Sequence, residues 1–337
     1  MRILVTGATG FIGSYVVRNL LKNPENQVFA THRRSSSFDL VEDIKEKVVW
    51  KEADVLDLPR LEDAISAVDY VIHAAAMVSM DSRQVRLMEQ VNIEGVTNVV
   101  NLCISHQIKR LIHLSSVTAL GFPKNELIDE SSSWQSRPFN SEYARTKYLG
   151  ELEVFRSIAE GLKAVIVNPP FVMGASHWYK GPNSIVSEIY RGLSFYPKGS
   201  SGIVDVRDLS KFIEIILFNE ELDGQKVICS ASNIEHKELF AHIANKLQKP
   251  VPRKQLSPIL GIMARTFDRM SSLFTGGERL ITKEGITIAN MPFKYDNSKS
   301  LNIPNFEYRE IEKTIDEVCK VFLSSIEAGR DYGILNI

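Results

Sequence analysis

The stretch RILVTGATGFIGSYVVRNLLKN, residues 2–23, decides the fold of this chain of 337 residues. Residues 2–7 form an apolar run with the length of a buried strand, and residues 11–23 carry apolar side chains at helical spacing. The glycine-rich turn between them, taken alone, is also typical of ordinary strand-to-helix connections. Its position directly after a buried strand and at the start of an amphipathic helix favours a dinucleotide-binding turn.

The three glycines of this turn, Gly7, Gly10 and Gly13, follow the spacing GxxGxxG. Gly7 and Gly10 allow a tight turn and a close approach of the backbone to a pyrophosphate, which the N-terminus of the helix stabilises. Gly13 lets the helix pack against the strand. The cofactor-binding residues expected in this turn are Gly7, Thr9, Gly10, Phe11, Ile12 and Gly13.

The first half of the chain repeats this alternation of strand and helix. Short apolar runs alternate with longer amphipathic segments, which predicts a parallel sheet covered by helices on both faces. The expected strands are 27–32, 47–55, 69–76, 110–116 and 162–170, and the expected helices are 58–68, 83–106 and 141–160. The fold class is therefore α/β, with a doubly wound parallel sheet.

The second half is less regular. Gly, Pro and Ser cluster in residues 174–184 and 196–202, and the strand and helix signals are shorter. We therefore expect a cofactor-binding domain over residues 1–170 and mainly a smaller substrate-binding cap over 171–337. Strands and helices around 203–232 are expected to return to the first domain.

The composition excludes several classes of protein. Lys and Arg number 40 and Asp and Glu 41, so the formal net charge of −1 does not favour nucleic-acid binding. The three cysteines, Cys103, Cys229 and Cys319, include no CxxC pair, which argues against a zinc site or a disulfide framework and suits a reducing compartment. The start MRILVTG does not resemble a signal peptide, and no apolar run approaches the length of a membrane span. We expect a cytoplasmic protein with no metal and no membrane contact.

The end of the second expected strand indicates which cofactor binds. Sites that prefer NAD place a carboxylate about 20 residues after the glycine turn, to bind the ribose 2′-hydroxyl. This chain has ATHRRSSS at residues 30–37, with no carboxylate before Asp39. Arg33 and Arg34 are suited to a 2′-phosphate, and Ser35 adds a possible hydrogen bond. NADP is favoured, with NAD as the alternative, although a solvated basic loop has the same composition.

The segment SEYARTKYLGE, residues 141–151, places Tyr143 and Lys147 four residues apart. On a helix this spacing puts both side chains on one face, and a solvated helix face is the ordinary explanation. A second explanation is chemical. A phenol has an unperturbed pKa of about 10, and a nearby ammonium favours its ionised form. Tyr143 would then act as general acid in carbonyl reduction and general base in alcohol oxidation.

Further motifs decide between these explanations. The chain contains TGATGFIG (6–13), ADVLD (53–57), VIHAAA (71–76), HLSSVTALG (113–121), YARTK (143–147) and NPPFVMG (168–174), in that order. It resembles the extended short-chain dehydrogenase/reductase superfamily, and is most similar to its dihydroflavonol-reductase and 3β-hydroxysteroid-dehydrogenase branch. The resemblance covers about residues 1–250. It implies a Rossmann fold and a catalytic Tyr143–Lys147 pair, with Lys147 also holding the nicotinamide ribose.

The resemblance also assigns roles to other positions. Ser116, placed by Gly121, is implied as the third catalytic residue, although its hydroxyl could instead bond the backbone. Asn92 matches a structural residue of the helix that supports the site. The implied cofactor contacts outside the glycine turn and the catalytic pair are His32, Arg33, Arg34, Asp54, Val55, Ala74, Ala75, Ala76, Pro169, Pro170 and Val172.

The resulting hypothesis is an NADP-dependent oxidoreductase that interconverts a carbonyl and a secondary alcohol on a small, largely apolar substrate. The alternative is a sugar-nucleotide epimerase or dehydratase with tightly held NAD. Strand 162–170 lacks the early Arg, and its continuation lacks the Gly-Pro, usual in those enzymes. A cofactor-holding regulator is a third possibility, but such proteins tend to lose the Tyr or Lys. Helices 83–106 and 141–160 are those through which relatives often form homodimers.

Four features of the chain have more than one interpretation. His73 and His113 lie in expected buried strands, where a histidine is more often a core group than a functional one. His177, Trp178 and Tyr179 belong either to a substrate-recognition loop or to a mobile surface. The amphipathic segment 257–274 is interpreted as a helix on the cap, with the wall of an apolar pocket as the alternative and a membrane-surface helix as a remote third.

Overall fold

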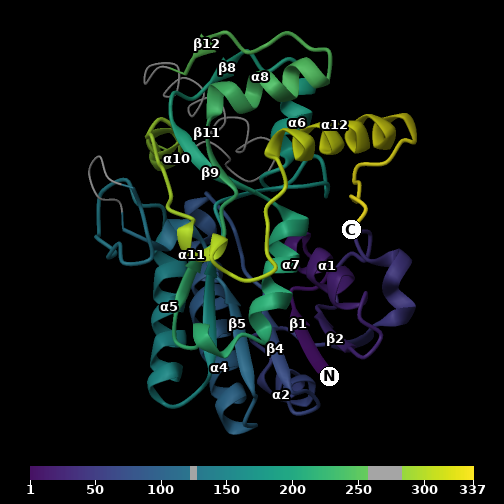
Figure 1. Cartoon of the computed structure of the whole chain (residues 1–337), viewed down its shortest axis with the longest axis vertical. Coiled ribbons are helices and arrows are strands. Elements are labelled where there is room, and N and C mark those ends of the chain that lie inside the picture. The colour runs from purple at the N-terminus through teal and green to yellow at the C-terminus, as the bar shows by residue number, and fades with distance from the viewer. Residues whose placement is uncertain (122–126, 257–282) are drawn as a thin grey trace.

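The computed structural model describes residues 1–121, 127–256 and 283–337, so the segment 257–274 lies outside the described residues. Figure 1 shows a lower lobe built around a parallel sheet and an upper lobe that forms the cap. Every strand pairing within the main sheet is parallel. Its seven strands are β1 Arg2–Thr6, β2 Gln27–His32, β3 Val49–Glu52, β4 Tyr70–His73, β5 Arg110–Leu114, β6 Ala164–Asn168 and β10 Lys226–Ile228.

Helices cover both faces of this sheet, as the buried strands predicted. Ile3 and Val5 of β1 pack into the same core cluster as α1 and α7, whereas Leu4 packs into a second cluster with α2, α4 and α5. This alternation follows from the two-residue period of a strand. The covering helices are α1 Phe11–Leu20, α2 Leu58–Ile65, α4 Gly95–Ser105, α5 Glu142–Ala159 and α7 Val206–Leu217.

The strand order is β3-β2-β1-β4-β5-β6-β10. The chain runs outward from β1 to β3 on one side and then from β4 outward on the other, so the direction of winding reverses between β1 and β4. In an open parallel sheet, ligands bind at such a switch point, outside the carboxyl ends of the strands. The doubly wound Rossmann architecture is therefore confirmed, and its topology points to the loops that follow β1 and β4.

The long helix predicted over residues 83–106 is present without a break from Ser82 to Ser105, but it is not α-helical throughout. A 3-10 turn at Ser82–Gln84 leads into α3, Val85–Glu89, and a π-helical turn at Gln90–Glu94 precedes α4. Asn92, in the π turn, is buried and clamps Met77 on both sides, because its Oδ1 accepts from the Met77 N–H at 2.8 Å and its Nδ2 donates to the Met77 carbonyl at 2.9 Å. The π turn thus aims Asn92 at the loop after β4.

The cap contains two small sheets and the helices beside them. One sheet has the order β11-β9-β7, and the other pairs β12 with β8. Of the segments expected to return to the main domain, β10 and α7 do so, whereas β9 pairs within the cap. The cap elements are β7 Phe171–Met173, α6 Ser184–Tyr190, β8 Phe195–Tyr196, β9 Ser200–Asp205, β11 Ser232–Glu235, α8 His236–Lys246, β12 Lys254–Gln255, α10 Lys283–Ala289, α11 Ser298–Leu301 and α12 Ile311–Glu327.

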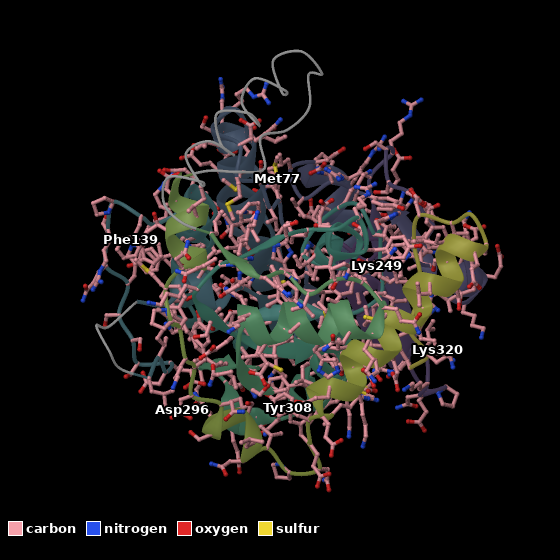
Figure 2. All side chains as sticks on the ribbon, turned by 90° about the horizontal axis from the view of Figure 1, so that it is seen from above. Met77, Phe139, Lys249, Asp296, Tyr308 and Lys320 are labelled. Atoms are coloured by element: carbon pink, nitrogen blue, oxygen red, sulfur yellow. The ribbon has the colours of Figure 1, made fainter. Side chains whose placement is uncertain are left out.

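The end of the chain ties the two lobes together. Helices α8 and α12 lie side by side across the cap, as the view from above shows (Figure 2). Beyond α12, the Leu335 N–H donates to the Tyr15 hydroxyl at 2.8 Å, and that hydroxyl donates to the Ala175 carbonyl at 2.9 Å. Tyr15 is in α1, so one buried phenol joins the first lobe, the cap and the last residues. Among the described residues, no helix combines the length and apolar character needed to cross a bilayer.

Candidate active site

The glycine turn after β1 presses closely against the end of β4. Gly7 has a φ of +67°, which favours glycine, and a Cβ at this position would lie 2.7 Å from both the Cα and the N of Ala75. A Cβ at Gly13 would lie 2.2 Å from the Gly7 carbonyl oxygen. Only glycines at these two positions allow strand, turn and helix to approach this closely, as the spacing predicted.

The N-terminus of α1 is open to a ligand. Gly10 is its N-cap and has no side chain to accept from the first N–H groups of the helix, and no other described side chain is bonded to them. Free N–H groups and the helix dipole favour an anion at this position. Ala74, Ala75 and Ala76 form the neighbouring strand end and are partly exposed, so small side chains border the turn. The arrangement fits the pyrophosphate of a dinucleotide.

A second polar region lies beyond the ends of β2 and β3. Arg33 and Arg34 are exposed and form no ion pair within the described part of the chain. They line a pocket of about 570 Å³ whose other walls carry both charge signs. His32, at the end of β2, turns its ring against Phe38, with ring centroids 5.1 Å apart. The pocket is lined by Arg33, Arg34, Ser35, Glu52, Asp54, Asp57 and Arg60.

Three side chains of the expected catalytic set meet at the carboxyl ends of the central strands. Ser116 lies beside the Tyr143 hydroxyl, near the start of α5, and acts on the pKa of that phenol. The Ser116 Oγ also accepts from the Thr118 N–H at 3.2 Å and from its hydroxyl at 3.0 Å, which fixes the serine side chain. Burial raises the pKa of Tyr143 to about 12, and Ser116 opposes that rise. The phenol is therefore protonated at neutral pH.

Lys147 lies one helical turn after Tyr143 and only 2% of it is exposed. Its Nζ donates to the Leu114 carbonyl, at the end of β5, at 2.7 Å. Burial lowers its pKa to about 8, and the charge of Glu151 opposes that change. Tyr143 and Lys147 are thus not part of a solvated helix face, because the lysine points into the protein and the tyrosine phenol is buried beside Ser116.

The two histidines of β4 and β5 lie near Lys147. His73 and His113 are paired in register, and their rings stack with centroids 5.4 Å apart. His73 Nδ1 lies 2.7 Å from the Thr6 hydroxyl, whereas no described residue hydrogen-bonds either ring nitrogen of His113. Burial, and secondarily the charge of Lys147, lowers the pKa of His73 to about 3 and that of His113 well below its usual value. Both rings are neutral at physiological pH.

The comparisons with known proteins agree with this geometry. The model of the NAD dependent epimerase/dehydratase family matches residues 3–195, more than half of the chain. The chain belongs to this family. It is 30% identical over 264 residues to tetraketide alpha-pyrone reductase 2 of Arabidopsis thaliana, covering 72% of this chain and 82% of that one.

Two further comparisons extend the likeness. Sterol demethylase protein B of Methylococcus capsulatus is 27% identical over 267 residues, which cover 77% of this chain and 79% of that protein. The crystal structure of the dTDP-glucose 4,6-dehydratase DesIV from Streptomyces venezuelae has a TM-score of 0.79 at 17% identity, covering 97% of this chain and 98% of that one. The structural likeness shows the shared fold. The family is one of NAD(P)-dependent oxidoreductases that act on small molecules, and this protein is such an enzyme.

The remaining predicted positions of this epimerase/dehydratase-family enzyme surround the same edge of the sheet. Asp54 faces the pocket of the arginines, whereas Val55 is buried, with its carbonyl accepting from Asn98 at 2.9 Å. Pro169 follows β6 and its carbonyl accepts from the Val117 N–H at 3.1 Å, next to Ser116. Pro170 is partly exposed and Val172 is buried in the first strand of the cap.

Sequence reasoning missed two residues next to the expected catalytic set. Glu151 is buried on α5, and its Oε1 accepts from the Asn168 Nδ2 at 2.6 Å. The same nitrogen donates to the Ser116 carbonyl at 2.9 Å. The spacing of Glu151, four residues after Lys147, placed it on the same helix face and was the available signal. Nothing local to Asn168 indicated its two partners.

The loop over residues 174–184 differs from both of its interpretations at Trp178. This side chain is fully buried and meets the ring of Phe322, in α12, edge to face at 5.1 Å. It is a core residue of the cap, neither exposed nor mobile. Tyr179 is exposed, and the guanidinium carbon of Arg191 lies over its ring, 4.5 Å from the ring centroid.

Among the described residues, no cluster of His, Cys, Asp and Glu suited to a metal ion is present.

Proposed function

We propose that this enzyme is an NADP-dependent reductase or dehydrogenase that interconverts a carbonyl and a secondary alcohol, with Ser116, Tyr143 and Lys147 as its catalytic residues. The observation that carries the proposal is the placement of Ser116 beside the Tyr143 phenol at the carboxyl edge of the sheet, with the Lys147 ammonium anchored on the Leu114 carbonyl one turn along the same helix. The switch point between β1 and β4 lies at this edge.

The chemistry follows from the protonation of these groups. A bound nicotinamide supplies or accepts the hydride. Tyr143 gives its proton to the substrate oxygen in reduction and takes it back in oxidation, and its raised pKa of about 12 keeps the phenol protonated in the absence of other charges. The charge of Lys147 favours the phenolate as the proton leaves. The Ser116 hydroxyl orients the substrate oxygen, because Thr118 holds its side chain in place.

The preference for NADP rests on the pocket that Arg33 and Arg34 line. Among its other walls, Glu52 and Asp57 already pair with Arg60. Arg33 and Arg34, which have no such partner among the described residues, offer their guanidinium groups to a 2′-phosphate. No carboxylate ends β2, where an NAD site would hold the ribose hydroxyls.

A largely apolar substrate is supported by the loop after β4. Val78 is 63% exposed and Met80 39% exposed, although both side chains are apolar. The Asn92 clamp on Met77 fixes the backbone where this loop begins. Exposed apolar side chains beside a catalytic group favour an apolar ligand. The names of two relatives refer to a sterol and to a tetraketide alpha-pyrone, which are largely apolar ring compounds.

The test measures nicotinamide absorbance after the enzyme is mixed with NADPH or NADH and with each member of a panel of aromatic, alicyclic and aliphatic ketones and aldehydes. Turnover with NADPH is expected, and Tyr143→Phe should abolish it. The matched control is Tyr148→Phe on the same helix, because Tyr148 stacks on Trp134 at 4.9 Å and should leave turnover intact. Absence of turnover together with copurified, tightly held NAD would overturn the proposal in favour of a sugar-nucleotide epimerase or dehydratase.

A further inference from the structure

A buried polar cluster adjoins the proposed catalytic group without belonging to it. It consists of Glu151 on α5, Asn168 at the end of β6 and Lys226 at the start of β10. Glu151 and Asn168 are almost completely buried. A buried carboxylate is costly unless it is paired and hydrogen-bonded, so its presence next to a proposed active site requires a physical explanation.

The contacts of Glu151 are those of an ionised carboxylate. Its Oε1 accepts from the Asn168 Nδ2 at 2.6 Å, and its Oε2 lies 3.8 Å from the Lys226 Nζ. Both oxygens therefore face a donor or a cation. Burial raises the pKa of Glu151, and the opposing groups are, in decreasing order of effect, Ser115, Lys226, Asn168 and Lys147.

Asn168 connects this carboxylate to the backbone of the proposed catalytic serine. Its Nδ2 donates both to Glu151 and, at 2.9 Å, to the Ser116 carbonyl. Because both partners are acceptors, the amide nitrogen rather than its oxygen must face them. A contact thus runs from Glu151 through one amide to Ser116, whose side chain lies beside the Tyr143 phenol.

Lys147 experiences the charge of Glu151 from one helical turn away. The other neighbours of Lys147 carry no charge that could balance its ammonium. Its Nζ donates to the uncharged Leu114 carbonyl on β5. The stacked rings of His73 on β4 and His113 on β5 are neutral. The charged groups around Lys147 are therefore Glu151 on its own helix and, beyond Glu151, Lys226 on β10. Two cations share one buried anion.

We propose that Glu151 is a positioning residue of the site: its carboxylate holds the charge on Lys147 and, through Asn168, fixes the backbone of Ser116. This inference rests on the proposed function of Ser116, Tyr143 and Lys147. It explains why a carboxylate is retained inside the protein between a helix and two strands.

The experiment measures the titration of Lys147 directly, in protein without cofactor. Lysine labelled with ¹³C at Cε reports the protonation of each ammonium by NMR, and the Lys147 signal is assigned by its absence from Lys147→Arg. Glu151→Gln keeps the shape and the acceptor for Asn168 but removes the charge, so the titration midpoint of Lys147 should fall by about one pH unit. Lys226→Gln removes the competing cation, so the midpoint should rise.

A matched control separates charge from helix stability. Glu153→Gln lies on the same helix but at a partly exposed position, where Glu153 pairs with Arg156 at 3.0 Å, and should leave the midpoint unchanged. An unchanged midpoint in Glu151→Gln would overturn the inference. Should that variant fail to fold, Lys226→Gln decides, and a midpoint that does not rise overturns the inference.

The rate profile then tests the same inference through catalysis. In Glu151→Gln, the loss of kcat at alkaline pH should begin about one pH unit lower than in the wild type, with the KM for NADPH changed by less than about threefold. A purely structural role would lower kcat equally at every pH. Absence of any Tyr143-dependent turnover in the wild type would defeat the proposed function alone, since the titration of Lys147 is read without turnover.

Discussion

The Lys147 ammonium donates a 2.7 Å hydrogen bond to the main-chain carbonyl of Leu114, the last residue of β5. This bond anchors the lysine of helix α5 to the carboxyl end of a central strand. A buried ammonium with a single recorded carbonyl acceptor retains donors for other partners. The same bond holds the ammonium one helical turn after Tyr143, and no carboxylate of the described residues forms an ion pair with it.

Loss of this charge should impair catalysis more than folding. Lys147→Met is expected to lower kcat by about 10²–10⁴-fold, because Tyr143 then lacks the charge that favours its ionised form. In the wild type, burial sets the pKa of Lys147 at about 8, so the lysine is charged below that pH and the reductase rate should fall as pH rises through it. Steady-state kinetics from pH 6 to pH 10 measure both effects. A Lys147→Met enzyme with wild-type kcat would refute this role.

Replacement of the two unpaired arginines should change the choice of cofactor. Arg33→Ala combined with Arg34→Ala is expected to weaken NADPH binding by about 10–100-fold, because hydrogen bonds to a charged phosphate contribute about 1.5–3 kcal/mol. NADH binding should change by less than about threefold. Fluorescence titration of each cofactor measures the two dissociation constants.

The control for this change is Arg60→Gln in the same pocket. Arg60 pairs with Glu52 and Asp57, so its removal should weaken NADPH binding far less. Equal losses of affinity for NADPH and NADH in the double variant would show that the two arginines do not bind the 2′-phosphate.

Gly7 and Gly181 offer a matched pair of substitutions. Both have a φ of +67°, but a Cβ at Gly7 meets the backbone of Ala75 at 2.7 Å, whereas a Cβ at Gly181 has nothing within 4 Å. Gly181→Ala should therefore cost only the backbone strain of about 1–2 kcal/mol. Gly7→Ala should cost more, or fold with the β1 and β4 loops displaced and cofactor binding lost. Urea unfolding and cofactor titration test this, and equal behaviour of the two variants would contradict the close approach.

The buried histidine of β4 should make the protein sensitive to acid. Burial lowers the pKa of His73 from 6.5 to about 3, so the folded protein keeps this ring neutral while the unfolded chain protonates it. The unfolded state then binds more protons below pH 6.5, and the free energy of unfolding decreases as pH falls toward 3. At pH 5, His73 alone should remove about 2 kcal/mol.

Urea unfolding at pH 7.5 and pH 5 measures this loss. His73→Gln removes the titrating ring and should reduce the difference between the two pH values by a similar amount. Tyr148→Phe, which leaves every histidine in place, should retain the full difference. Identical pH dependence in His73→Gln and the wild type would contradict the assignment.

The sequence predicted those features that depend on neighbouring residues. The glycine spacing, the buried strands and the positions of Tyr143 and Lys147 on one helix all follow from local periodicity, and the structure has each of them. The family resemblance added Ser116, whose position beside Tyr143 brings together two elements on either side of a long loop.

The features that were missed depend on contacts between distant segments. In the π turn at Gln90–Glu94, the Asn92 side chain accepts a hydrogen bond from the Met77 N–H, a contact that no helical pattern encodes. Trp178 lies in a loop rich in glycine and serine, yet it is buried because α12, more than 100 residues later, supplies Phe322. Asn168 likewise acquires its role only when α5 and β6 come together.

The path of the chain between β6 and β10 has a consequence for how the protein is made. β6 ends at Asn168 and β10, its neighbour in the sheet, begins at Lys226, so much of the cap is synthesised between them. Until β10 leaves the ribosome, β6 pairs only with β5, and the backbone groups along its other edge are open to other chains. The nascent lower lobe therefore cannot complete its sheet before cap residues have emerged. A cap exchanged between relatives must also include the segment that leads the chain back to β10.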